Sequence, residues 1–204
     1  MSSLLLRGFA LGFAVAASPG PIFFLCLRRT LLRGRVYGLV SGLGVATADA
    51  FYAAVASLGL AAVTTAIASG RRPLAVIGGA ALIAIGVRIL LQRRTEPNAA
   101  ASTAGAGLGW AYLSTLGLTI TNPATILSFA ALAATLGLSA GSGIVKPAAL
   151  VGGVLLGSAT WWCVLALAAS SLRGRLSPAV IGAISTFSGL AIAILGMLAI
   201  YSAF

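Results

Sequence analysis

Asp49 is the side chain with the clearest capacity for chemistry. Only two acidic residues occur in the 204, and the other, Glu96, lies in a polar stretch. Asp49 stands inside an apolar run, roughly 20 Å from its start if that run is helical. Because an ionised carboxylate in a membrane costs several kcal/mol, such a residue is by default functional. We interpret Asp49 as a proton carrier or the partner of a substrate ammonium; the alternative is a structural acid paired with an arginine or Thr47.

Two helix-breaking motifs interrupt other apolar runs. They contain Ser18, Pro19, Gly20 and Pro21 in the first, and Thr121, Asn122, Pro123 and Thr125 in the second. A proline inside a helix removes a donor and displaces the carbonyl four residues earlier, and backbone groups freed in hydrocarbon need a partner. Paired broken helices suit a transporter's binding site. We predict that these residues, with Tyr52, bind substrate; the alternative is that the prolines only shape packing.

The composition sets the class of protein. Sixty percent of the residues are apolar, 7% are charged and the mean hydropathy is +1.10, as expected for an integral membrane protein. The net charge of +11 comes from scattered basic clusters, so we expect no nucleic-acid partner. With no histidine and one acid at membrane depth, we expect no metal site, no cofactor and no enzymatic activity.

Six apolar runs are long enough to cross a bilayer, which takes about 20 residues each. They span residues 4–27, 36–62, 74–91, 108–134, 147–169 and 180–201. The stretch 93–107 is polar and rich in small residues, so it is the predicted linker. It divides the chain into an N-terminal three-helix repeat, 1–92, and a C-terminal one, 108–204.

Several features of the first half recur in the second. The pairs are Pro19 and Pro123, 104 apart; Gly44 and Gly153, and Tyr52 and Trp161, 109 apart; and Gly79 and Gly189, and Gly86 and Gly196, 110 apart. With three spans in each half, the second copy enters the membrane from the opposite side. The predicted fold is an all-α integral membrane protein of six transmembrane helices, arranged as two inverted three-helix repeats with broken first and fourth helices.

The basic residues predict the orientation. Loops after the first, third and fifth spans carry eight arginines, including Arg28 and Arg29, whereas the opposite side carries four basic residues. Since cytoplasmic loops are enriched in lysine and arginine, we expect both termini outside the cytoplasm.

The sequence resembles the LysE/RhtB superfamily of amino-acid exporters. SPGP, the following GRVYGLVSGLGVATADAFYAAVASLGL and the later TNPATILSF carry the resemblance, which extends over essentially the whole chain. It implies a six-span exporter of the bacterial inner membrane, driven by the proton gradient. Carried over by position, its motifs fall on Pro19 to Pro21, Gly44, Asp49, Asn122 and Pro123. Ala81-Leu82 and Ala124 depart from the usual pattern, which leaves the substrate open.

We therefore expect a secondary transporter that exports an amino acid or related small zwitterion by proton antiport, as the two three-helix units rock. The alternative is an exporter or channel for a metal cation or other small ion. Expected partners are the amino acid, protons and the lipid membrane, with a homo-oligomer as an open alternative.

Overall fold

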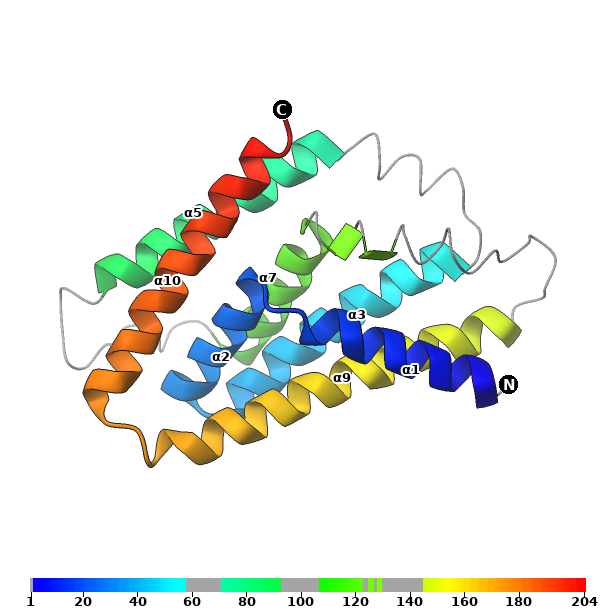
Figure 1. The fold of residues 1–204 in the computed structure, drawn as a ribbon, viewed down its shortest axis with the longest axis horizontal. Coiled ribbons are helices and arrows are strands. Elements are labelled where there is room, and N and C mark those ends of the chain that lie inside the picture. Colours follow the sequence, from blue (N-terminus) through cyan, green and yellow to red (C-terminus); the bar gives the residue numbers. More distant parts are fainter. Residues whose placement is uncertain (1, 58–70, 93–106, 123–124, 127, 130–144) are drawn as a thin grey trace.

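The computed structural model describes residues 2–57, 71–92, 107–122, 125–126, 128–129 and 145–204 (Figure 1). Within these residues every regular element is a helix. The helices are α1 (Ser2–Ala17), α2 (Pro21–Arg33), α3 (Arg35–Ser57), α5 (Arg71–Gln92), α7 (Leu108–Ile120), α9 (Val145–Arg173) and α10 (Pro178–Tyr201). The prediction of an all-α membrane protein is therefore confirmed.

Four described helices, α3, α5, α9 and α10, are long and apolar enough to cross a bilayer, and α1 with α2 adds a fifth if this bent pair is one span. The first predicted span is thus two helices at 79° to one another. The fourth predicted span, 108–134, is described only in part, by α7 and four later residues. The predicted linker lies outside the described residues except for Gly107.

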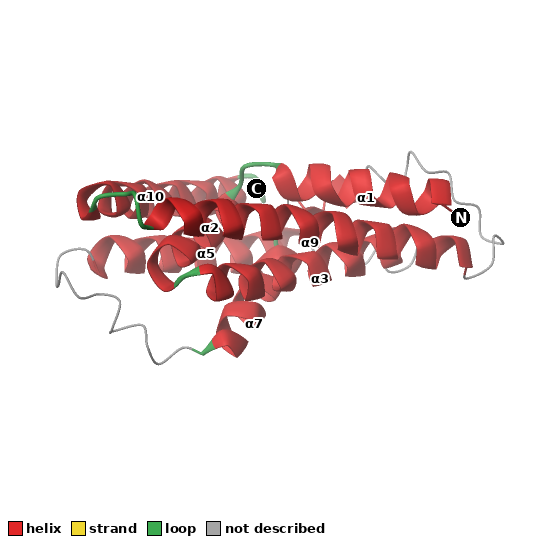
Figure 2. Ribbon diagram, turned by 90° about the horizontal axis from the view of Figure 1, so that it is seen from below, coloured by secondary structure: helices red, strands yellow, loops and turns green. Residues whose placement is uncertain are grey.

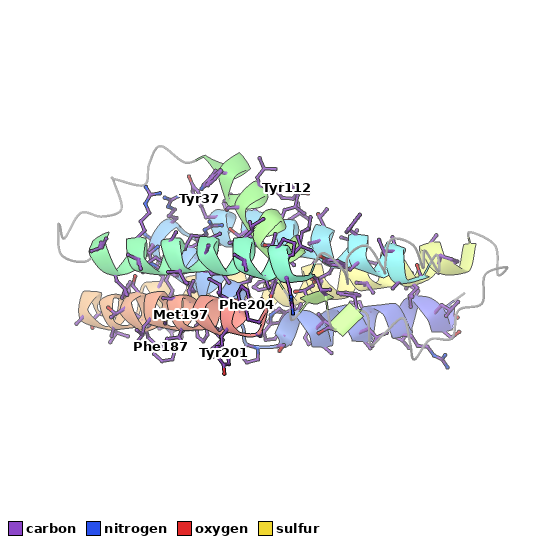
Figure 3. The ribbon with its side chains drawn as sticks, turned by 90° about the horizontal axis from the view of Figure 1, so that it is seen from above. Tyr37, Tyr112, Phe187, Met197, Tyr201 and Phe204 are labelled. Carbon is purple, nitrogen blue, oxygen red and sulfur yellow. The ribbon has the colours of Figure 1, made fainter. Side chains whose placement is uncertain are left out.

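The helices pack across the two halves of the sequence. α1 lies along α9, α3 lies between α9 and α7, and α5 pairs with α10, while α2 contacts α3, α9 and α10 (Figures 1 and 2). Buried side chains from α1, α2, α3, α5, α7, α9 and α10 meet in one apolar core. On the outside of α10, the exposed Tyr201 points away from the other helices, as lipid-facing residues do (Figure 3).

Glycines set the closest helix contacts. A Cβ on Gly153 of α9 would lie 2.8 Å from the backbone nitrogen of Phe9 and 3.0 Å from Cα of Gly8, both in α1. Gly157, four residues later, also faces the backbone of Phe9. This small-xxx-small pair brings two backbones together, a device that membrane helices use because lipid gives no hydrophobic drive between helices.

Candidate solute-binding site

The helix breaks at residues 18–20, where the sequence predicts it. α1 ends at Ala17, and the backbone N–H of Ser18 donates to the carbonyl of Val15 at 3.3 Å. Gly20 is extended, and Pro21 opens α2 at the first helical position, where a missing N–H costs nothing. The N–H of Phe24 donates to the carbonyl of Gly20 at 3.3 Å. The N–H groups of Ile22 and Phe23 have no acceptor within α2, because no residue of the helix lies four positions before them. We call residues 18–20 the first break.

A second interruption follows α7. The N–H of Thr121 donates to Gly117 and that of Asn122 to Thr119, so the helix closes tightly after Ile120. A bond from the N–H of Ile126 to the carbonyl of Asn122, 3.1 Å long, begins the next helical turn. We call residues 121–122 the second break; Pro123, also predicted to bind substrate, lies outside the described residues.

One cavity of about 50 Å³ joins both breaks to Asp49. Its lining consists of Val15, Ala16, Ser18, Gly20, Ile22, Phe23, Val45, Asp49, Thr119, Asn122, Thr125 and Trp162. Polar side chains and the start of α2 therefore meet apolar side chains from α1, α3 and α9 around a single space. Five of the ten residues predicted to form the site border it: Ser18, Gly20, Asp49, Asn122 and Thr125.

Asp49 is fully buried, with 1% of its surface exposed. The hydroxyl of Ser158, on α9, donates to its Oδ2 at 2.7 Å. Thr47, the partner considered in the sequence, turns away: its hydroxyl donates to the carbonyl of Leu43 and accepts from Tyr112. Among the described residues no arginine forms an ion pair with Asp49, and Ser158 is its hydrogen-bond donor.

Sequence reasoning missed Ser158. A signal was present, because Ser158 stands 109 residues after Asp49, the separation that also relates Gly44 to Gly153. Applying that separation to the acid would have indicated the serine.

The other predicted residues that the structure describes do not line the cavity. Pro19 and Pro21 shape the first break, with Pro21 buried. The hydroxyl of Thr121 donates to the carbonyl of Gly117 in its own helix at 2.9 Å. Tyr52, on α3, donates its hydroxyl to the carbonyl of Ile120, the last residue of α7. Tyr52 thus stabilises the end of α7 at the second break without bordering the cavity.

Placing Arg28 and Arg29 in a loop was wrong. Both lie within α2, because this helix continues to Arg33. Arg28 donates from Nε to Ser185 of α10 at 2.7 Å. Arg29 donates to Ser41 of α3 at 3.1 Å, and to two groups of α7, the Ala111 carbonyl at 3.0 Å and the Ser114 hydroxyl at 2.9 Å. The pair ties the second half of the bent span to three other helices.

Apolar helices of bilayer length, with a cavity where two helices are interrupted, are typical of a membrane transport protein. The LysE type translocator family matches over residues 13–203, so the chain belongs to this family, which is one of transporters and not of enzymes. It is similar to the uncharacterized membrane protein YahN of Escherichia coli (strain K12), with 30% identity over 114 residues. That match covers 55% of this chain and 51% of YahN, about half the length of each. No solved structure matches the chain.

Proposed function

We propose that the protein exports amino acids or related small zwitterionic metabolites across the bacterial inner membrane, by proton antiport with alternating access. The observation that carries the proposal is the meeting of Asp49 with both helix breaks at one cavity. Broken helices expose backbone groups inside a membrane, where they can replace the water around a polar solute.

The cavity offers complementary groups for the two ends of an amino acid. The first turn of α2 borders it through Gly20, Ile22 and Phe23, and the positive end of a helix dipole favours a carboxylate. Trp162 also borders it, and its buried indole N–H has no hydrogen-bond partner among the described residues. Asp49 supplies the opposite charge for an ammonium group. The carboxylate of a bound amino acid would accept hydrogen bonds from the start of α2 and from Trp162, while its ammonium group would pair with Asp49.

Proton coupling follows from competition at Asp49. A buried carboxylate without a cation nearby favours its neutral form, whereas a substrate ammonium favours the ionised form. Binding of the substrate would therefore release the proton, and departure of the substrate would take one up. In one half of the cycle a proton neutralises Asp49, and in the other half the substrate ammonium neutralises it.

Exchange of solute and proton at one site requires access that alternates between the two sides of the membrane. The space of about 50 Å³ holds only a few water molecules, so it has to widen to admit a larger solute. An inverted repeat supplies two related conformations for this purpose. The contacts of α5 and α10 support it: a Cβ on Gly79 would lie 2.7 Å from the carbonyl oxygen of Gly196, and one on Gly86 would lie 2.6 Å from that of Gly189. A shift of 110 residues takes Gly79 to Gly189 and Gly196 to Gly86. The two contacts are therefore exchanged by this shift, as expected for contacts related by a two-fold axis.

The helix packing agrees with the same axis. α1 packs mainly on α9, and α7, its counterpart, packs mainly on α3, the counterpart of α9. The main packing partner of α1 thus lies in the second half of the chain, and that of α7 lies in the first half. We therefore assign the rocking bodies to the pairs α1–α9 and α3–α7, in place of the sequence halves 1–92 and 108–204. Asp49 and Ser158 then lie where the two bodies meet.

The test is transport by purified protein in liposomes. With a pH gradient imposed, radiolabelled amino acids should move against their own gradient and saturate with concentration. Asp49→Asn should abolish coupled movement while the protein still inserts and purifies normally. Glu96→Gln is the matched control, since it removes the other acid of the chain.

Unchanged coupled transport in Asp49→Asn would exclude Asp49 as the proton carrier. Conductance that does not saturate, or movement of metal cations without movement of amino acids, would instead identify a channel or an ion exporter.

A further inference from the structure

Trp161, beside the cavity residue Trp162, carries a buried indole N–H with no hydrogen-bond partner among the described residues. The ring stands edge-on to Phe13 of α1, with centroids 5.4 Å apart. Trp161 therefore lies against the last turns of α1, immediately before the first break. An unpaired donor in a membrane interior is unfavourable, so its occurrence here needs a physical reason.

Tyr52 provides the comparison. It stands 109 residues before Trp161, as Gly44 stands before Gly153 and Asp49 before Ser158. Its hydroxyl donates to the carbonyl of Ile120, where α7 ends at the second break. A helix end leaves carbonyls without an internal donor, and Tyr52 satisfies one of them.

The first break has the same construction. Ala16, in the last turn of α1, stands 104 residues before Ile120, the separation that also relates Pro19 to Pro123. Trp161 on α9 thus lies near the end of α1. Tyr52 on α3 lies near the end of α7 in the same way. One of the two aromatic donors is paired, and the other has no partner in the part of the chain that the structure describes.

We propose that Tyr52 and Trp161 are alternating caps of the two breaks. In the conformation described here, Tyr52 holds the Ile120 carbonyl; in the opposite-facing conformation, Trp161 donates to the Ala16 carbonyl and Tyr52 releases Ile120. Each conformation keeps one such bond, so the exchange leaves the number of hydrogen bonds constant. Two conformations of nearly equal free energy are what a carrier needs in order to populate both. This role rests on the proposed alternating access.

The experiment measures which side of the membrane the cavity opens to. A reporter, Ser18→Cys, is placed at the cavity in a background with Cys26→Ala and Cys163→Ala. A membrane-impermeant methanethiosulfonate reagent is then added to either side of oriented vesicles, and the ratio of the two labelling rates is determined. Tyr52→Phe and Trp161→Phe each delete one donor and keep the ring.

We expect the two variants to shift the ratio in opposite directions, each by about fivefold, the change typical for loss of one hydrogen bond. The double variant should return to within about twofold of the parent. Trp110→Phe, at an exposed tryptophan near the start of α7, is the matched control and should leave the ratio unchanged.

Shifts in the same direction, or no shift, with a parent labelled from both sides would overturn the exchange and leave the proposed function standing. If Trp161→Phe does not fold, Tyr52→Phe alone decides, because an unchanged ratio in that variant also overturns the exchange. A parent labelled from one side only at every pH gradient would overturn alternating access, and the proposed function with it.

Discussion

The hydroxyl of Ser158 and the carboxylate of Asp49 are 2.7 Å apart, and their positions in the sequence differ by 109, the same interval that separates Gly44 from Gly153. The bond therefore joins α3 to α9 between corresponding sites. One site carries the acid and the other carries a donor for it. Under the proposed inverted repeat, α3 supplies the acid and its counterpart α9 supplies the hydrogen-bond donor for it.

Ser158→Ala should lower the stability of the protein by about 1–3 kcal/mol, because it removes the donor from a buried carboxylate oxygen. The measurement is the apparent melting temperature in detergent. Thr160→Ala is the control: it deletes a hydroxyl on the same helix that, within the described residues, bonds to the carbonyl of Leu156 in the preceding turn. Equal losses in the two variants would show that the bond to Asp49 contributes nothing.

Gly153→Ala should separate α1 from α9. Its new methyl group would meet the backbone of Leu5, Gly8 and Phe9, which cannot move away as a flexible side chain can. We expect a loss of about 1–3 kcal/mol, typical of overpacking, measured as thermal stability. The adjacent Gly152 has no neighbouring atom within 4 Å of an added Cβ, so Gly152→Ala should be neutral. Similar losses at both positions would contradict the close contact.

Arg29→Lys should destabilise the bent span. A guanidinium donates in a planar fork, and Arg29 uses it to reach Ser41, Ala111 and Ser114 at once. A lysine keeps the charge but cannot reproduce that geometry, so a loss of about 2 kcal/mol is expected.

The matched substitution for Arg29 is Arg175→Lys, in the exposed connection between α9 and α10. Chemical denaturation of both variants provides the comparison. An Arg29→Lys protein as stable as the Arg175→Lys protein would mean that the charge alone is sufficient.

The distribution of arginines predicts that both termini lie outside the cytoplasm. Alkaline phosphatase fused after Phe204 should consequently be active in cells, since it folds only outside the cytoplasm. The same enzyme fused after Arg175, in a predicted cytoplasmic loop, should be inactive. The reverse pattern would invert the orientation of the whole chain.

Much of this arrangement could be predicted from the sequence. Prolines predict a helix break from the local sequence alone, and in the structure the first break lies at Ser18 to Gly20. A single acid in an apolar run reports a buried polar group, and Asp49 is buried. Both signals depend on the chemistry of one short segment, so no knowledge of the packing was needed.

Other features depend on which helices become neighbours, and the sequence carries little of that. Arg28 and Arg29 looked like loop residues because charge marks a span end; inside α2 they are retained because α3, α7 and α10 offer acceptors. The sharp bend of 79° between α1 and α2 likewise depends on what each helix packs against. Tyr52, predicted to bind substrate, donates to the carbonyl at the end of α7, a contact that depends on the packing of α3 against that helix.

The packing of α1 on α9 also affects how the chain is made. α1 ends at Ala17 and α9 begins at Val145, so during synthesis the first helix enters the membrane long before its main neighbour has been translated. Until then the surface around Gly8 and Gly12 lacks the α9 backbone that it contacts in the folded protein. If translation stopped between the two halves, α1 would lack its main neighbour, α9. Cellular quality control would then be expected to remove the incomplete chain.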